Sequence, residues 1–215
     1  MIPKKIHYCW FGGAPLPAQA EKCIASWRKF CPDYELIRWD ESNFDLDENP
    51  YVRYCYDNKK WAFLTDYIRL AVVLRYGGVY FDTDVELLKP LDDLLQNGGC
   101  YSFETPDMVN TGQGFGAEAG HPTVAAMAAE YEKLCPDEQG NFALAACPAL
   151  NTRALLALGL RPDGSKQTVA GAVILPVDYM NPYDEPTGRL KKTENPLSIH
   201  WYSKSWISPG LRLRS

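Results

Sequence analysis

Gly77-Gly78-Val79-Tyr80-Phe81-Asp82-Thr83-Asp84 is the stretch of this 215-residue chain that decides its fold. The two glycines end the strongest helical pattern of the sequence, residues 61–76, whose apolar side chains recur at helical spacing. An apolar run follows, which we expect to form a buried strand over residues 79–85. Because alternate side chains of a strand share a face, Tyr80, Asp82 and Asp84 would project together.

Strands and helices alternate along the rest of the chain. We expect strands at residues 6–11, 34–39, 79–85, 100–103 and 173–177, and helices at residues 18–30, 61–76, 123–134 and 152–158. Residues 40–58 are acidic and contain Pro50, which indicates a loop and a short helix. The alternation predicts an α/β fold with a largely parallel sheet. We expect a single domain over residues 1–215, in which residues 191–215 form a loop that closes over the active site.

Composition and charge exclude several classes of protein. Hydrophobic residues make up 46% of the chain and charged residues 23%, as in globular domains. The net charge of −5 offers no basic surface for a nucleic-acid backbone, so we expect no nucleic-acid partner. We find no apolar run near the ~20 residues that span a bilayer, and residues 1–5 lack the layout of a signal peptide. The seven cysteines lack Cys-x-x-Cys spacing, which favours reduced thiols. We therefore expect a cytoplasmic protein, associated with membranes peripherally at most.

The two aspartates at the end of the predicted strand are candidate metal ligands. Asp82 and Asp84 would repel each other there unless a cation lay between or beside them. Carboxylate oxygens suit hard ions such as Mg²⁺ or Mn²⁺, whose other positions take water or phosphate oxygens. The alternative is a surface strand end with two solvated carboxylates. The apolar strand and the glycine pair before it favour the metal site.

A narrow polar strip interrupts the otherwise apolar helix at residues 61–76. Asp66 and Arg69 form this strip, and buried charges must be paired or bound to a ligand. Asp66 would accept hydrogen bonds from a ribose or sugar hydroxyl, and Arg69 would face diphosphate or sugar oxygens. The alternative is a simple i,i+3 salt bridge that stabilises the helix.

Aromatic and basic residues near the two ends of the chain suggest further contacts. Trp10 ends the first predicted strand before Gly12-Gly13, where it would stack on a nucleobase or, alternatively, pack in the core. In the tail, His200 would complete the metal site, Lys204 would neutralise a leaving diphosphate, and Trp206 would cap the site. The alternative for His200 is an exposed loop residue.

Three segments together resemble the family 32 glycosyltransferases, the Asp-x-Asp sugar transferases. They are residues 2–13 (IPKKIHYCWFGG), 62–70 (AFLTDYIRL) and 77–84 (GGVYFDTD). That group includes fungal initiating mannosyltransferases and bacterial capsular or surface polysaccharide transferases, and the same trio is similar to the catalytic domain of the large glucosylating cytotoxins. The resemblance implies a GT-A fold, a Mg²⁺ or Mn²⁺ ion, and transfer of a hexose from a UDP- or GDP-sugar with retention of configuration. It also implies a glycan or lipid-linked glycan acceptor.

The resemblance assigns a role to each matching residue. It implies that Trp10 stacks on the base, that Asp66 and Arg69 hold the donor sugar and diphosphate, and that Asp84 binds the metal directly. Asp82 would contact the ribose and the metal shell.

Two residues outside these three segments are matched more loosely. His200 resembles the metal-binding His that precedes a Ser-Trp or Pro-Trp pair in related retaining transferases, and Asn110 resembles the family's Asn near the reacting sugar. Tyr80 shares the strand face of the aspartates and joins the predicted nucleotide-sugar site with Lys204 and Trp206.

Charge development on the leaving diphosphate indicates a mechanism. The metal on Asp84, with Arg69 and Lys204, would stabilise that charge. Retention then requires front-face attack or double displacement. The sequence places no obvious carboxylate nucleophile, so both routes stay open.

Two other functions fit parts of the pattern. A haloacid-dehalogenase-type phosphatase would use Asp82 as its nucleophile, because an apolar strand followed by Asp-x-Asp also begins that motif. The motif usually lies near the N-terminus, however, and the later Gly-Asp-x-x-x-Asp motif is absent. A non-catalytic nucleotide-sugar-binding module is the third interpretation, and the intact acidic residues argue against it.

Overall fold

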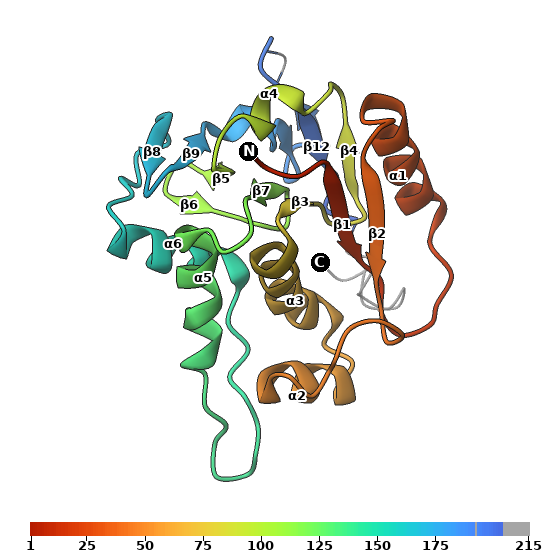
Figure 1. Cartoon of the computed structure of the whole chain (residues 1–215), viewed down its shortest axis with the longest axis vertical. Coiled ribbons are helices and arrows are strands. Elements are labelled where there is room, and N and C mark those ends of the chain that lie inside the picture. Colours follow the sequence, from red (N-terminus) through yellow and green to blue (C-terminus); the bar gives the residue numbers. More distant parts are fainter. Residues whose placement is uncertain (192, 204–215) are drawn as a thin grey trace.

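The structure is a computed structural model that describes residues 1–191 and 193–203 (Figure 1). The helices are α1 (Ala18–Phe30), α2 (Pro50–Asp57), α3 (Trp61–Tyr76), α4 (Asp92–Leu95), α5 (Pro122–Glu132) and α6 (Cys147–Ala157), with a 3₁₀ turn at Val177–Tyr179. Helices α1 and α3 have the bounds predicted from the sequence. The short helix expected within residues 40–58 is α2, and Pro50 begins it, where its missing N–H costs no helical hydrogen bond.

A central eight-stranded sheet organises the chain. Its strands are β1 (Lys5–Cys9), β2 (Glu35–Trp39), β3 (Gly78–Tyr80), β5 (Gly99–Thr105), β6 (Met108–Val109), β7 (Phe115–Ala117), β8 (Gln167–Val169) and β9 (Ala172–Leu175). The order is β2-β1-β3-β7-β5-β9-β8, and β6 pairs with β5. The pairings give β2, β1, β3, β5 and β9 one common direction, whereas β7, β6 and β8 run oppositely. The α/β fold with a mostly parallel sheet is therefore confirmed.

Helices cover both faces of this sheet, with a hydrophobic core on each (Figure 1). Successive strand residues alternate between the two cores. Tyr80 of β3 joins the core under α3 and α5, whereas Val79 and Phe81 join the core under α1. Because Asp82 continues this alternation, it faces the same side as Tyr80 and meets α3.

The predicted strand over residues 79–85 is wrong in its second half. Strand β3 ends at Tyr80, and a turn at Thr83–Asp84 precedes β4 (Val85–Leu87). The Val85 N–H donates to the Asp82 carbonyl at 3.0 Å, which closes the turn. Asp84 therefore leaves the face of Tyr80 and Asp82 and approaches them from the β4 side.

The tail was expected to form a loop throughout, and this is wrong for three residues. Ser198–His200 form β12, which pairs antiparallel with β4 and places His200 opposite Val85. Ser198, Ile199 and His200 are all buried, so this part of the tail belongs to the packed structure. A small ribbon of β10 (Tyr183–Asp184) and β11 (Arg189–Leu190) precedes it.

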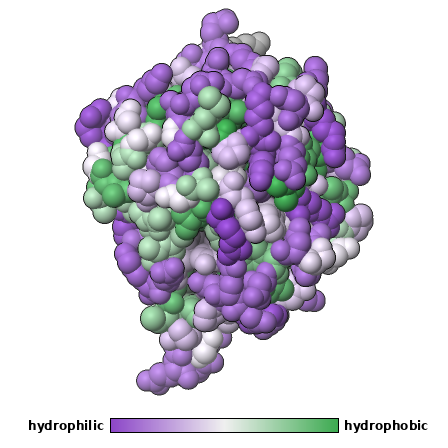
Figure 2. Space-filling view, in the orientation of Figure 1, coloured by the Kyte–Doolittle hydropathy of each residue, from purple (hydrophilic) through white to green (hydrophobic). Residues whose placement is uncertain are grey.

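The surface is that of an ordinary globular chain. The face in Figure 2 is largely hydrophilic, with apolar side chains in small separate patches. The connection between α5 and α6, residues 133–146, projects away from the sheet (Figure 1). Within the described residues, we find no helix with the length and apolarity needed to cross a bilayer.

Candidate active site

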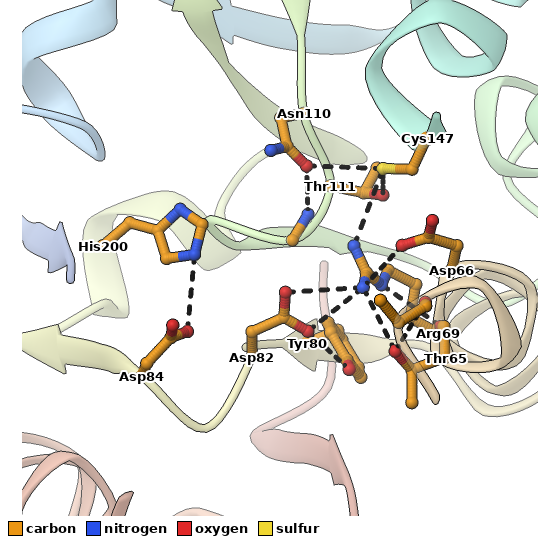
Figure 3. A network of polar contacts seen from close by, with 12 residues as sticks. Thr65, Asp66, Arg69, Tyr80, Asp82, Asp84, Asn110, Thr111, Cys147 and His200 are labelled. Atoms are coloured by element: carbon orange, nitrogen blue, oxygen red, sulfur yellow. Dashed lines mark hydrogen bonds and ion pairs between the residues drawn. The ribbon is translucent and has the colours of Figure 1, made fainter. Parts of the chain in front are cut away.

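Asp82 lies at the centre of the polar network in Figure 3, where α3 meets the end of β3. Its carboxylate accepts a hydrogen bond from the Tyr80 hydroxyl at 2.9 Å and pairs with the Arg69 guanidinium at 3.1 Å. Arg69 also lies 5.2 Å from the centroid of the Tyr80 ring. Burial raises the pKa of Asp82, and the neighbouring guanidinium opposes that rise.

Asp66 and Arg69 form the ion pair that their spacing on α3 predicts, at 2.8 Å. The Arg69 side chain is only 4% exposed, and its Nη2 bridges Asp66 and Asp82. Burial raises the pKa of Asp66 to about 7, although the guanidinium favours its charged form. The pair is therefore more than an exposed salt bridge within one helix, because Arg69 also holds Asp82 after β3.

Asp84 is held by the tail. His200 Nε2 lies 3.3 Å from its Oδ1, and the N–H and Oγ–H of Ser203 donate to its Oδ2 at 2.8 and 3.0 Å. Burial alone would raise the pKa of Asp84, but these contacts outweigh burial and lower it to about 2. Asp84 is thus a stable carboxylate at neutral pH, as a metal ligand must be.

The structure brings Asp82, Asp84 and His200 together. One potential ligand atom from each lies within 4.8 Å of the others. Opposite ligands of an octahedral ion with ~2.1 Å bonds lie about 4.2 Å apart, so a small adjustment would close this triad on an ion. Two carboxylates and an imidazole suit Mn²⁺, and carboxylates also suit Mg²⁺. The donor set therefore fits the expected divalent ion.

The other two histidines have structural roles instead. His7 Nε2 lies 2.8 Å from the Gly77 carbonyl, and its Nδ1 accepts from Trp39. His121 is the N-cap residue of α5 and contacts the Thr123 hydroxyl at 2.7 Å. These contacts leave His200 as the histidine of the candidate site.

A loop after β6 forms another wall of the site (Figure 3). Asn110 Oδ1 accepts from the Gly112 N–H at 2.7 Å, and the Gly112 carbonyl accepts from the Asp82 N–H at 3.2 Å. A Cβ at Gly112 would lie only 2.6 Å from Asp82 Oδ2 and 2.7 Å from Arg69 Nη1. Glycine is therefore required here because the loop backbone touches the carboxylate and the guanidinium.

Sequence reasoning missed several residues that line the network. Cys147, at the start of α6, places its thiol 3.6 Å from Arg69 Nη1 and 3.3 Å from Asn110 Oδ1. Ser203 was also missed. Neither carries a local signal, because each contact joins segments far apart in the chain. Gly112 had one signal, since it lies in the Gly-rich run that follows Asn110.

The remaining predicted residues lie at the margin or outside the described part. Trp10 is half-buried just after β1 and donates through Nε1 to the Ala14 carbonyl at 2.6 Å. Strand β1 lies between β2 and β3, so Trp10 follows the strand beside the one that leads to Asp82. Lys204 and Trp206 lie outside the described residues.

Comparison with known proteins shows a family resemblance over the part of the chain that carries the site. Residues 17–100 match the family described as "Glycosyltransferase sugar-binding region containing DXD motif". This segment contains Asp66, Arg69, Asp82 and Asp84, and the resemblance to the Asp-x-Asp transferases is confirmed. Over this segment, which carries the acidic residues of the site, the chain resembles the Asp-x-Asp glycosyltransferases.

Particular relatives agree with this class. Inositol phosphoceramide mannosyltransferase 3 of Schizosaccharomyces pombe is 33% identical over 129 residues, which cover 56% of this chain and 35% of the relative. Inositol phosphoceramide mannosyltransferase 1 of the same organism is 27% identical over 132 residues, which cover 56% and 40%. The match thus spans well under half the length of either relative. The solved PaToxG glycosyltransferase shares the fold, with a TM-score of 0.54 and 19% identity over 73% of this chain and 69% of that one.

Proposed function

We propose that this protein is a metal-dependent, retaining glycosyltransferase that moves a hexose from a UDP- or GDP-sugar to a glycan or lipid-linked glycan. The observation that carries the proposal is the convergence of Asp82, Asp84 and His200 within 4.8 Å, beside the buried pair of Asp66 and Arg69. Acidic groups gathered at this density repel one another unless cations compensate them. Arg69 compensates Asp66 and Asp82 from one side, and a divalent ion would do so from the other.

Asp84 and His200 are the residues that would hold the ion most directly, with Asp82 completing the set. A bound Mn²⁺ or Mg²⁺ would neutralise the charge that develops on the leaving diphosphate. Metal-binding imidazoles usually have their second nitrogen hydrogen-bonded. His200 Nδ1 is buried without such a partner among the described residues, which leaves it available to a bound ligand or water.

Asp66 and Arg69 would shape the donor-sugar side of the site. Arg69 forms ion pairs with Asp66 and Asp82, so it would orient these two carboxylates. Asp66 would accept hydrogen bonds from sugar hydroxyls through the oxygen that faces away from Arg69. Trp10 would stack on the nucleobase at the end of β1, while Tyr80 and Asn110 would hold the floor of the site. Lys204 and Trp206 remain candidates for the diphosphate and the cap.

The acceptor and the biological setting are part of the same proposal. A role in surface or capsular polysaccharide synthesis would place the enzyme in the cytoplasm, where nucleotide sugars are available, with at most a peripheral contact to the membrane. The named relatives are mannosyltransferases, which makes GDP-mannose a donor to test first.

Slow hydrolysis of the donor tests this function without a known acceptor. A panel of UDP- and GDP-hexoses, each with Mn²⁺, Mg²⁺ or chelator, should contain a donor that is hydrolysed only with metal. Asp84→Asn should abolish most of that activity and leave the thermal melting temperature within a few degrees of wild type. Asp107→Asn, a change at an exposed aspartate, is the matched control and should keep full activity. Full activity in excess chelator would contradict the proposal.

A further inference from the structure

Glu104 joins two segments that flank the candidate metal site. It lies near the end of β5, and its Oε1 accepts a hydrogen bond from Asn110 Nδ2 at 2.9 Å and another from the Tyr202 hydroxyl at 3.1 Å. Asn110 belongs to the loop after β6, whereas Tyr202 belongs to the tail, 98 residues away from Glu104. One carboxylate oxygen therefore holds both segments at once.

The first branch runs from Glu104 to Asp82. Asn110 is oriented by Glu104 and turns its Oδ1 to the Gly112 N–H at 2.7 Å. The Gly112 carbonyl in turn accepts from the Asp82 N–H, and its Cα faces the Asp82 carboxylate. The same loop is anchored to β5 by Gln113, whose side chain donates to the carbonyls of Ser102 and Phe103. A shift of Asn110 would therefore reach Asp82 within two contacts.

The second branch runs from Glu104 to Asp84. The Tyr202 ring lies against the His200 ring, with 4.1 Å between the centroids. Tyr202 has φ of +48°, in the left-handed region that side chains rarely adopt. This turn directs the next residue, Ser203, so that its N–H and hydroxyl both reach Asp84 Oδ2. The hydrogen bond of the Tyr202 hydroxyl to Glu104 holds this strained residue in place.

We infer that Glu104 is a positioning residue of the transfer reaction. It fixes the loop of residues 110–112 against Asp82 and the tail against Asp84. The inference rests on the proposed function for its catalytic meaning, but the coupling itself belongs to the ligand-free protein. Glu104 acts through Asn110 and Tyr202 and need not touch the ion. Through these two contacts, Glu104 sets the distances between Asp82, Asp84 and His200.

Two variants separate the hydrogen-bonding role from charge and from simple destabilisation. Glu104→Gln keeps an oxygen that can accept both hydrogen bonds, whereas Glu104→Ala removes both. Hydrogen–deuterium exchange of the metal-free protein should show at least tenfold faster exchange at Gly112 and Ser203 in the alanine variant. The glutamine variant should stay within threefold of wild type at both sites. Glu138→Ala, at an exposed residue of the projecting connection, is the control and should change neither.

Titration with Mn²⁺ alone, followed by electron paramagnetic resonance, gives the functional readout. We expect Glu104→Ala to weaken Mn²⁺ affinity at least fivefold and Glu104→Gln by less than twofold. Unchanged exchange at both Gly112 and Ser203 in the alanine variant would overturn the inference. Equal losses of Mn²⁺ affinity in the alanine and glutamine variants would overturn it as well.

Tyr202→Phe decides the question if the alanine variant does not fold. It removes one of the two hydrogen bonds and should speed exchange at Ser203 while leaving Gly112 unchanged. Equal exchange at Ser203 in this variant and wild type would overturn the inference. Failure of wild type to bind Mn²⁺ would contradict the proposed function, whereas the exchange data on the metal-free protein would still test the coupling.

Discussion

Gly112→Ala is a single-methyl test of how the site is packed. The added Cβ would lie 2.6 Å from Asp82 Oδ2 and 2.7 Å from Arg69 Nη1, and 3.1 Å from Asn110 Oδ1. The shortest of these is roughly 0.8 Å inside ordinary van der Waals contact, and neither charged group can yield without breaking the Asp82–Arg69 pair. The substitution therefore acts on the candidate site itself.

Overpacking of this kind typically costs about 1–3 kcal/mol. If the strain falls on the donor site, kcat/KM for metal-dependent donor hydrolysis should drop by about 5- to 150-fold. The melting temperature should fall by about 2–4 °C per kcal/mol for a chain of this size. Gly98→Ala is the matched control, because its Cβ would find its nearest neighbour, His121, at 3.4 Å. Activity of Gly112→Ala within twofold of the control would refute the packing that we describe.

Two further predictions concern the donor side. Burial raises the pKa of Asp66 to about 7, so the folded protein keeps a proton that the unfolded chain releases near its ordinary value of 3.8. The free energy of unfolding of wild type, relative to Asp66→Asn, should therefore fall as pH rises from 4 to 7 and then level off, as urea titrations at each pH would show. If the free energies of unfolding of wild type and Asp66→Asn changed with pH in parallel, this prediction would be contradicted. If Trp10 stacks on the base, Trp10→Ala should weaken nucleoside diphosphate binding by about 1–3 kcal/mol, whereas Trp10→Phe should retain most of it. Calorimetric titration measures both, and equal affinities for wild type and Trp10→Ala would rule out stacking.

Local patterns were enough to predict most of the fold. Helices α1 and α3 have the predicted bounds, because their apolar spacing is helical and because prolines or glycines flank them. The strand after Gly77-Gly78 was predicted too long, since the apolar run of residues 79–81 was extended through the polar residues 82–84 to Val85. The turn at Thr83–Asp84 that divides it depends on pairing of β4 with β12, more than a hundred residues later. Such long-range pairing leaves no mark on local periodicity.

The same distinction between local patterns and long-range contacts applies to the candidate site. Asp66 and Arg69 were singled out by a polar strip on an apolar helix, and Arg69 pairs with both Asp66 and Asp82. Cys147 and Glu104 carried no such signal, because their meaning comes from which loops the fold brings together. The tail around His200 was predicted to close over the site as a loop. It reaches Asp84 as a buried strand end, and its apolar residue Ile199 was the available hint of burial.

The most direct test of the proposed metal site is to locate the ion. Crystals grown with Mn²⁺ and the nucleoside diphosphate of the best donor, measured at the manganese absorption edge, would show where the ion binds. We predict one strong anomalous peak within about 2.4 Å of an Asp84 oxygen and adjacent to Asp82 and His200 Nε2, with a diphosphate oxygen completing its coordination. A fully bound diphosphate with no peak at these residues, or with the ion held elsewhere, would contradict it.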